Sequence, residues 1–307
     1  MLGWYSRLSF SRKEELAGYL FILPWLIGFV VFQAGAMVTA LAMSFLKADF
    51  LSPPTFVGTR NFERLIDDDT FFKALGNTAI YALGRMPFVI VIGLSIALLL
   101  NRDRWGVRGM RTLYFLPSVT SGVAVALLWI WMFNPDYGLI NSFLALFGIR
   151  GPGWIWTEEW ALPGLIVVSL WGVGSSMLIY LAGLRGVPVE LYEAASLDGA
   201  GPARKFFRIT LPMISPTLFY TLITGIIFSY QVFLNAYILT NGGPNNATLT
   251  MVLYVYRKAF QEFQMGYASA VAWVLFMIIL LFTLLVFRSS SAWVYYEGGL
   301  RRTGPGT

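Results

Sequence analysis

The chain has 307 residues, of which 57% are hydrophobic and only 12% charged, with a mean hydropathy of +0.66. This composition excludes an ordinary soluble domain. The absence of cysteine and histidine excludes disulfides, a Ser-His triad and histidine-based zinc motifs.

Charged residues are clustered, and the stretches between the clusters are long enough to cross a bilayer. A transmembrane helix needs about 20 apolar residues, and six windows of the sequence reach that length with at most one charge, Arg85. We therefore predict an all-α polytopic membrane protein. Its six transmembrane helices are expected near residues 19–45, 75–100, 112–133, 161–183, 215–240 and 265–287.

The basic residues give the expected orientation. Arg7, Arg12 and Lys13 precede the first window as in a signal peptide, but the window is about twice as long as a signal core, so we interpret it as a retained helix. Lys and Arg favour cytoplasmic segments. With the N-terminus inside, 14 of them lie inside and 7 outside. Both termini and the loop 184–210 are therefore expected in the cytoplasm, and the net charge of +6 needs no nucleic-acid partner.

The predicted outer loop before the second span carries three consecutive aspartates, Asp67, Asp68 and Asp69. Consecutive side chains on a helix point in different directions. We therefore interpret them as a solvated acidic face rather than a metal site. Asp69–Thr70 suits the cap of a helix that lies along the surface before the span.

Arg85 is the only ionisable residue inside a predicted span. A charge at the centre of a span costs roughly 2.5–3.5 kcal/mol on insertion scales and is usually functional. Arg85 is therefore a candidate contact for a hydroxyl-rich or anionic solute. The competing interpretation, which we favour, is that it pairs with another subunit or extends toward the interface.

The fourth span contains the small residues Gly172 to Ser176 (Gly-Val-Gly-Ser-Ser). They resemble a nucleophile turn only superficially, and close packing of two helices explains them better. Trp171 and Tyr180 of this span, with Trp129 of the third, are weaker candidates for the solute pathway. Interfacial belts of tryptophan and tyrosine are the alternative explanation.

A polar segment separates the fourth and fifth spans. Pro188 fits a first helical turn, Glu190 and Glu193 suit a helix N-terminus, and Gly199 suits a stop. The pattern predicts one short helix over 188–198. Leu191, Ala194, Ala195 and Asp198 then share a narrow face. The plain alternative is a surface helix that only joins two spans.

The uncharged window 209–256 is too long for one helix, and Gly242 to Asn246 (Gly-Gly-Pro-Asn-Asn) is a strong turn signal. We place the fifth helix at 215–240, followed by an exposed loop. The helix carries a polar stripe of Ser229, Tyr230, Gln231 and Asn235. Hydroxyl and amide groups beside aromatic faces suit a sugar pocket, so this stripe is the favoured cavity wall. Hydrogen bonding between helices is the alternative.

No glycine-rich phosphate loop occurs in the sequence, so ATP must be held by another subunit if transport is ATP-driven. The phrase Glu-Ala-Ala-x-x-Asp-Gly-Ala at 193–200, followed by Ile-Thr-Leu-Pro at 209–212, resembles the EAA signature of binding-protein-dependent ABC importer permeases. Likeness to their sugar and glycerol-phosphate branch extends over most of 19–288. It is carried by segments 61–62, 74–78, 98–101, 108–117, 228–233, 239–244 and 263–270.

The resemblance implies a type I ABC importer permease fold in a bacterial inner membrane. It implies a cytoplasmic N-terminus 1–18, a first transmembrane helix 19–46, an extracytoplasmic loop 47–72, a permease core 73–288 and a cytoplasmic tail 289–307, which we expect to be disordered. It also implies that ATPase coupling is carried by Glu193, Ala194, Ala195, Asp198 and Gly199.

The implied partners are a second permease chain, an ATPase dimer that binds ATP and Mg, an extracytoplasmic solute-binding protein and membrane lipid. No cofactor is expected in this chain. Many relatives carry an acidic residue shortly after the position of Phe233, where this chain has Leu234 and Asn235, so substrate contacts are not transferred there.

We therefore expect a transport subunit, not an enzyme, that forms half of the pathway for a carbohydrate or related polyhydroxy solute. The alternative is a self-contained channel or secondary transporter, which leaves the segment 190–212 unexplained. A membrane hydrolase with a Ser-Lys dyad would need a lysine in a span, and no predicted span contains one.

Overall fold

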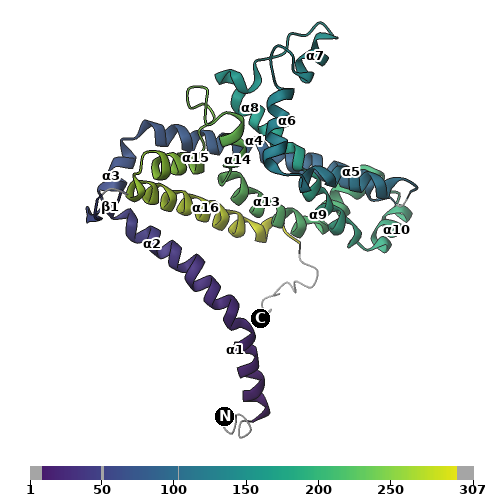
Figure 1. Cartoon of the computed structure of the whole chain (residues 1–307). Helices are drawn as coiled ribbons and strands as arrows, with labels where there is room; N and C mark the ends of the chain where they lie inside the picture. Colours follow the sequence, from purple (N-terminus) through teal and green to yellow (C-terminus); the bar gives the residue numbers. More distant parts are fainter. Residues whose placement is uncertain (1–8, 50–51, 103, 296–307) are drawn as a thin grey trace, which may run out of the picture. The chain divides into compact units, whose positions relative to one another are not determined.

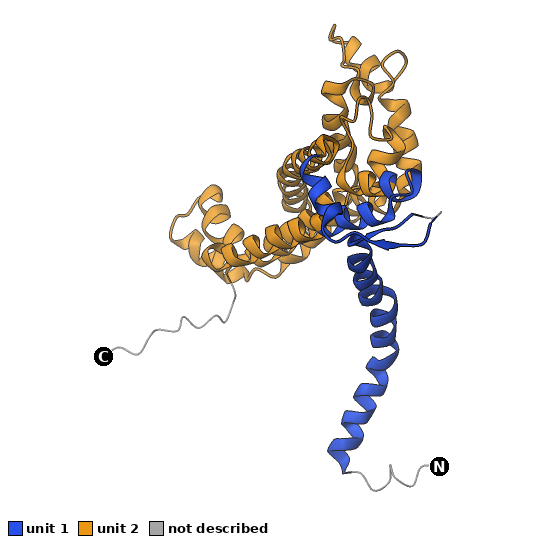
Figure 2. Ribbon diagram, turned by 90° about the vertical axis from the view of Figure 1, so that its left-hand side faces the viewer, with its two compact units in different colours: residues 1–67, 257–273 blue, residues 68–256, 274–307 orange. Residues whose placement is uncertain are grey.

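The computed structural model describes residues 9–49, 52–102 and 104–295. The chain falls into two compact units, residues 1–67 with 257–273 and residues 68–256 with 274–307 (Figure 2). Arg7, Arg301 and Arg302, which enter the charge count, lie outside the described residues, as does 296–307 of the predicted tail. Four described helices could cross a membrane, or six if two bent helix pairs each form one span, which agrees with the predicted six.

The first unit begins with one long helical segment (Figure 1). α1 (Phe10–Gly28), the π-helical turn η2 (Phe29–Ala34) and α2 (Gly35–Ser44) follow one another without a break. The helix begins at Phe10 rather than at residue 19. The charged residues that precede the apolar window are good helix formers, so the helix extends through them. None of its side chains before Ser44 is buried.

A short β-hairpin and a surface helix follow α2. β1 (Leu46–Lys47) pairs antiparallel with β2 (Thr55–Phe56). The all-α prediction missed these strands, because a strand of two residues is too short to show the alternation of apolar and polar side chains that identifies a strand in a sequence. In α3 (Arg60–Ile66), Asn61 Nδ2 donates to the carbonyl oxygens of Ser44 (2.8 Å) and Leu46 (2.9 Å). Asn61 thereby satisfies a carbonyl that the end of α2 leaves without a helical partner.

The first unit also holds η6 (Arg257–Gln261) and the start of α16 (Met265–Trp293). A Cβ on Gly266 would lie 1.9 Å from the Leu46 carbonyl oxygen, so this contact requires glycine. α16 confirms the predicted sixth span but continues to Trp293. The expectation of a disordered tail from residue 289 is therefore wrong for its first residues, because the sequence after Arg288 has no helix breaker before glycine at 298.

The second unit begins with α4 (Asp69–Leu100), which contains the predicted second span. Asp68 caps it, accepting from the backbone N–H of Thr70 (2.9 Å) and Phe71 (3.2 Å). The predicted cap at Asp69–Thr70 and the separate surface helix are wrong, because the capped helix runs directly into the span. Asp68 also accepts from the Tyr254 hydroxyl, so the solvated acidic face is limited to Asp67 and Asp69.

The predicted third and fourth spans are each broken. α5 (Val107–Val119) meets α6 (Gly122–Met132) at a 95° bend. α8 (Glu158–Ser169), with the 3₁₀ turn η4 (Leu170–Gly172), meets α9 (Gly174–Arg185) at 49°. The prediction of continuous helices is wrong at both points. In the third span Pro117 removes a backbone donor and Thr120 is extended at φ −75° and ψ 144°. Between α6 and α8 lie α7 (Leu139–Ala145) and η3 (Trp154–Trp156).

The fifth span is interrupted after α13 (Ser215–Tyr230), and α14 (Leu234–Leu239) resumes beyond the break. The loop after α14 is not simply exposed as predicted, since residues 247–250 are buried. Asn77 donates to the carbonyls of Asn246 (2.8 Å) and Leu249 (3.1 Å), and Thr78 Oγ1 accepts the Met251 N–H at 2.9 Å. These contacts from α4 hold the loop and the start of α15 (Met251–Tyr256).

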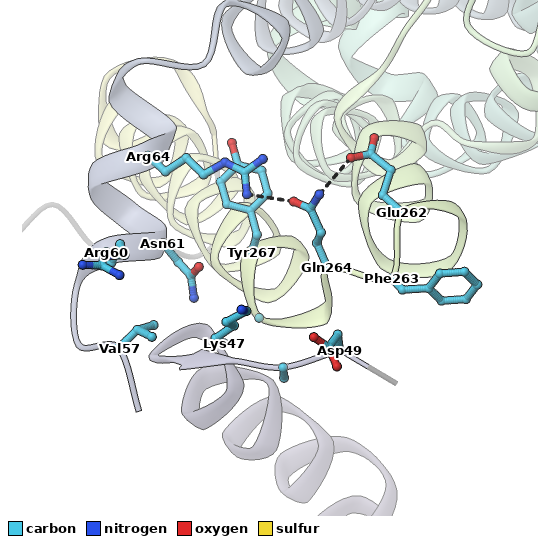
Figure 3. A pocket seen from close by; sticks show the side chains of 12 residues that line it. Lys47, Asp49, Val57, Arg60, Asn61, Arg64, Glu262, Phe263, Gln264 and Tyr267 are labelled. Atoms are coloured by element: carbon cyan, nitrogen blue, oxygen red, sulfur yellow. Dashed lines mark hydrogen bonds between the residues drawn. The ribbon is translucent and has the colours of Figure 1, made fainter. Parts of the chain in front are cut away.

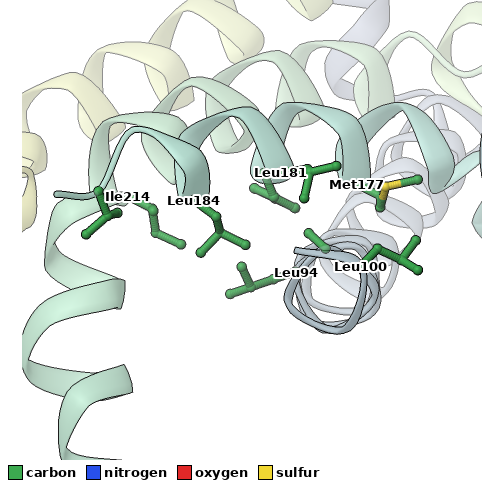
Figure 4. Close-up of a cluster of buried hydrophobic side chains, with 9 residues drawn as sticks. Leu94, Leu100, Met177, Leu181, Leu184 and Ile214 are labelled. Atoms are coloured by element: carbon green, nitrogen blue, oxygen red, sulfur yellow. The ribbon is translucent and has the colours of Figure 1, made fainter. Parts of the chain in front are cut away.

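An apolar cluster joins α4, α9 and the residue before α13 (Figure 4). Its buried members are Leu94, Ala97, Leu100, Met177, Tyr180, Leu181, Leu184, Val187 and Ile214. Close packing by small residues is confirmed at Gly174, where a Cβ would lie 2.0 Å from the Tyr114 carbonyl oxygen of α5. At Gly172 a Cβ would meet nothing within 4 Å, so that glycine has no such role.

Candidate functional site

A short helix, α10 (Val189–Leu197), lies between the fourth and fifth spans in sequence. Pro188 is its N-cap residue and not part of its first turn as predicted. Gly199 has φ +71°, the Ala200 N–H donates to the Ala195 carbonyl at 2.9 Å and the Gly199 N–H to the Ser196 carbonyl at 3.1 Å. This is a Schellman ending. The predicted stop at Gly199 is confirmed.

Tyr192 anchors α10 to the rest of the second unit. Its side chain packs against the apolar cluster, and its hydroxyl lies 2.9 Å from Thr210 Oγ1. Lys205 Nζ donates to Ser196 Oγ at 2.5 Å. Thr210 and Lys205 belong to the helical segment α11 (Pro202–Lys205), η5 (Phe206–Thr210) and α12 (Leu211–Met213), which leads into α13. α10 is thus attached to α9 by the chain and, by side chains, to the segment that leads into α13.

The residues predicted to couple transport lie on the outside of α10. Glu193, Ala194, Asp198 and Gly199 are exposed, and Ala195 is half-buried. The predicted narrow face is therefore split, because Ala195 and the neighbouring Tyr192 are half-buried whereas the other members of that face are exposed. Sequence reasoning missed this inward face. The large apolar side chains of Leu197 (91% exposed) and Leu191 (41%) accompany the outer residues, and exposed apolar groups of this kind are typical of a binding surface.

The three broken spans meet one another in the second unit. α5 contacts η4, α6 contacts α14, and η4 contacts α4. A Cβ on Gly122 at the start of α6 would lie 2.5 Å from Leu234 at the start of α14. Irregular backbone at membrane depth is tolerated where it is covered by protein or lines a water-filled cavity. Transporters also build their solute sites from discontinuous helices. The breaks therefore mark the candidate pathway, which hydropathy alone did not locate.

Arg85 lies beside this region. The side chain is half-buried on α4, and Nη1 donates to Ser229 Oγ at 3.0 Å, next to the end of α13. Tyr81, one turn earlier on α4, is buried, and its side chain lies near Ser169 at the end of α8. These side-chain contacts connect α4 to two of the broken spans at the breaks themselves.

The predicted polar stripe does not share one environment. Ser229 is buried and faces Arg85, whereas Tyr230 is 6% exposed and stacks on Phe282 of α16 with ring centroids 5.5 Å apart. Gln231 is exposed within the break, and Asn235 is half-buried on α14. Ser229, Gln231 and Asn235 therefore lie at or next to the break, while Tyr230 turns toward α16.

The aromatic candidates of the fourth span also separate. Tyr180 is fully buried, with its hydroxyl 2.9 Å from Thr221 Oγ1, so it belongs to the packing of α9 against α13. Trp171 in η4 is 40% exposed and edge-on to Trp129, with centroids 5.7 Å apart. Among the described residues, Trp129 Nε1 is the one buried side-chain polar atom without a partner.

The model of the family described as "binding-protein-dependent transport system inner membrane component" matches residues 89–293. The chain belongs to this family. Among curated proteins, the permease is similar to the probable ABC transporter permease protein YesP of Bacillus subtilis, with 43% identity over 291 residues that cover 93% of the permease and 94% of YesP. It is 34% identical to the lactose transport system permease protein LacF of Rhizobium radiobacter over 289 residues, covering 92% and 96% of the two chains.

A solved structure gives the same result for the fold. In the bacterial alginate ABC transporter, in complex with an alginate pentasaccharide-bound periplasmic protein, one chain matches the permease with a TM-score of 0.82 and 25% identity. The match covers 93% of the permease and 98% of that chain. The permease is therefore a multi-pass inner-membrane protein with the type I ABC importer permease fold. It is the transport subunit of an importer rather than an enzyme, and the channel or secondary-transporter alternative is not favoured.

Proposed function

We propose that this chain is one of two permease subunits of an ATP-driven carbohydrate importer. In this proposal α10 binds a separate ATPase dimer, which holds ATP and Mg, on the cytoplasmic side. An extracytoplasmic solute-binding protein delivers the solute. The names of similar proteins support the solute class, since LacF is a lactose permease and the solved transporter carries alginate.

The observation that carries the proposal is the construction of α10. Its outer residues Glu193, Ala194 and Asp198 are free to meet another protein, while its inner side is fixed by Tyr192. The small alanine side chains allow close approach, and the carboxylates favour a basic or N–H-rich groove. A displacement of α10 would act on α9 and on the start of α13, and both spans contain a break.

The first helical segment supports a second permease chain in the assembly. Its 35 residues carry no buried side chain before Ser44, although they include a glutamine, Gln33, within a π-helical turn. π-helical turns are frequent at functional sites. An amide within a span needs a hydrogen-bonding partner. In the proposed assembly a helix of the second permease covers part of this surface and lipid covers the rest.

Solute is proposed to pass the three breaks. Arg85, Ser229, Gln231, Asn235 and Trp171 would line the passage, because each lies at or beside a break. Tyr230 and Tyr180 would support the wall from behind, since both are buried against other helices. Loss of the Arg85–Ser229 hydrogen bond during transport would free a guanidinium and a hydroxyl for solute hydroxyl groups.

The partner assignment is tested by co-purification and reconstitution. The chain, co-expressed with the neighbouring permease and ATPase genes, should purify as one complex whose ATPase activity rises when the solute-binding protein is added. Uptake should require all components. Solute transport by this chain alone in proteoliposomes would overturn the proposal in favour of a channel or secondary transporter.

Replacing Gln231 with leucine should lower uptake severalfold without altering assembly, because the change keeps the side-chain size and removes an exposed amide from the proposed passage. Thr224→Val on the preceding helix α13 is the matched control, since the Thr224 hydroxyl donates only to the backbone of its own helix, at 2.8 Å from the Tyr220 carbonyl. Initial uptake rates with equal amounts of assembled complex are the measurement. Equal rates for wild type and Gln231→Leu would remove Gln231 from the passage.

A further inference from the structure

A pocket of about 470 Å³ lies within the first unit, between the β-hairpin, α3 and the start of α16 (Figure 3). Its charged lining consists of Lys47, Arg60 and Arg64 against Asp49 and Glu262. By the expected topology, all these residues are extracytoplasmic. Neither α10 nor the broken spans contribute residues to this pocket.

Arg64 is held in a fixed orientation. Its guanidinium lies 4.2 Å from the centroid of the buried Tyr267 ring, and its Nη1 donates to Gln264 Oε1 at 2.8 Å. Gln264 Nε2 in turn donates to Glu262 Oε2 at 3.2 Å. Figure 3 shows this row from Arg64 to Glu262 at the edge of the pocket. A guanidinium fixed in this way loses little side-chain entropy when it binds an anion.

The two carboxylates of the pocket already have cationic or hydrogen-bonding neighbours. Glu262 pairs with Lys258 at 2.7 Å. Burial lowers the pKa of Arg257, and the negative charge of Glu262 partly offsets that lowering. Asp49 accepts from the backbone N–H (2.6 Å) and hydroxyl (2.8 Å) of Ser52.

The exposed Lys47 and Arg60 make no side-chain hydrogen bond or ion pair within the part of the chain that the structure describes. Together with Arg64, these two side chains give the pocket a net positive charge, which attracts a negatively charged group of a partner.

The pocket lining includes a strained segment, residues 262–264. Phe263 has φ +56°, a conformation that is unusual for a bulky side chain, and the residue is 48% exposed. Strain of this kind is maintained when the surrounding structure requires it and is concentrated at functional segments. An exposed aromatic side chain near arginine and lysine is the composition of a protein-binding surface, in which aromatic and arginine side chains supply most of the affinity.

We propose that this pocket receives an acidic side chain of the extracytoplasmic solute-binding protein. Its carboxylate would lie among Lys47, Arg60 and Arg64, and Phe263 would contact the surface of the binding protein around that side chain. The inference rests on the proposed function, which supplies the binding protein as partner. Asp49 and Glu262 also line the pocket and limit the negative charge that it accepts, so we assign it one carboxylate. A lipid phosphodiester carries the same single charge, but the exposed Phe263 of the lining favours a protein partner.

The test uses the complete transporter in nanodiscs and its purified solute-binding protein. Arg60→Glu should raise the binding-protein concentration that gives half-maximal ATPase stimulation by about tenfold, since a like charge would face the carboxylate. The shift should shrink as salt is raised. Arg150→Glu is the matched control, an exposed extracytoplasmic arginine in the other unit, and should leave this concentration within about twofold of wild type.

Basal ATPase activity and subunit stoichiometry distinguish the two proposals. If no ATPase assembles with the wild-type chain, the proposed function fails before the pocket is tested. If the complex is intact and Arg60→Glu responds to the binding protein as wild type does, the pocket proposal is overturned. A lipid site would instead appear as loss of phosphatidylglycerol-dependent thermal stabilisation in Arg60→Glu without any change in stimulation, and would also overturn it.

Position can be tested independently because the chain contains no cysteine. Arg60→Cys labelled with a benzophenone maleimide should photo-crosslink to the purified binding protein, whereas labelled Arg150→Cys should not. Failure of labelled Arg60→Cys to crosslink, with or without crosslinking from Arg150→Cys, would contradict binding at the pocket.

Discussion

Replacing Gly174 with alanine is expected to prevent formation of a stable permease. An added Cβ would lie 2.0 Å from the Tyr114 carbonyl oxygen and 2.9 Å from the Phe115 Cα. Both are backbone atoms of α5, so no side-chain rotation relieves the clash. Overpacking costs about 1–3 kcal/mol even where side chains can adjust, and native proteins are stable by only about 5–15 kcal/mol. The measurements are the yield of monodisperse protein after extraction and its thermal midpoint.

Gly172→Ala is the matched control in the same small-residue segment. A Cβ at Gly172 would meet nothing within 4 Å, so this variant should be extracted with the yield and midpoint of the wild type. The pair separates close backbone approach from glycine content. If Gly174→Ala behaved like Gly172→Ala, the contact between α5 and α9 could not be as tight as described.

Hydropathy predicted the spans well and their continuity poorly. The cost of leaving polar groups in lipid depends on composition, so the length and number of apolar windows are visible in the sequence. A break depends on whether neighbouring protein satisfies the freed backbone groups. After α13, for example, the Val232 carbonyl accepts from Thr250 Oγ1 at 2.9 Å, which is a contact between distant parts of the chain. Apolar composition around Gln231 carries no sign of that partner.

The same distinction applies to the candidate site. The end of α10 was predictable, because glycine's preference for a left-handed C-terminal residue is local. The role of Asn77 was not, because the loop that it holds lies 169 residues away. The inward position of Tyr192 follows a local signal, since its aromatic ring is the largest side chain of α10. Its partner Thr210 could not, since that contact depends on how the segment 202–213 folds back.

Gly199→Val is expected to uncouple ATP hydrolysis from uptake while leaving the complex assembled. Gly199 has φ +71°, and a left-handed residue with a side chain costs about 1–2 kcal/mol, with β-branched residues the least tolerated. A Cβ here would meet nothing within 4 Å, so the cost is purely conformational and confined to the end of α10. An energy of 1–2 kcal/mol changes a population by about 5- to 30-fold. The amount of solute taken up per ATP hydrolysed should therefore decrease by about 5- to 30-fold relative to wild type.

Two substitutions decide whether the conformation of Gly199 matters rather than its size. Gly199→Asn should retain most of the coupling, because asparagine tolerates the left-handed region. Gly201→Val should also retain it, since Gly201 is extended at φ −70° and ψ 168°, which any residue adopts. The three variants therefore place similar bulk near one helix end with different strain. If all three transported like wild type, the Schellman ending would not be needed to hold α10 against the ATPase. If all three variants lost coupling, added bulk at the end of α10, rather than a change in its backbone conformation, would explain the loss.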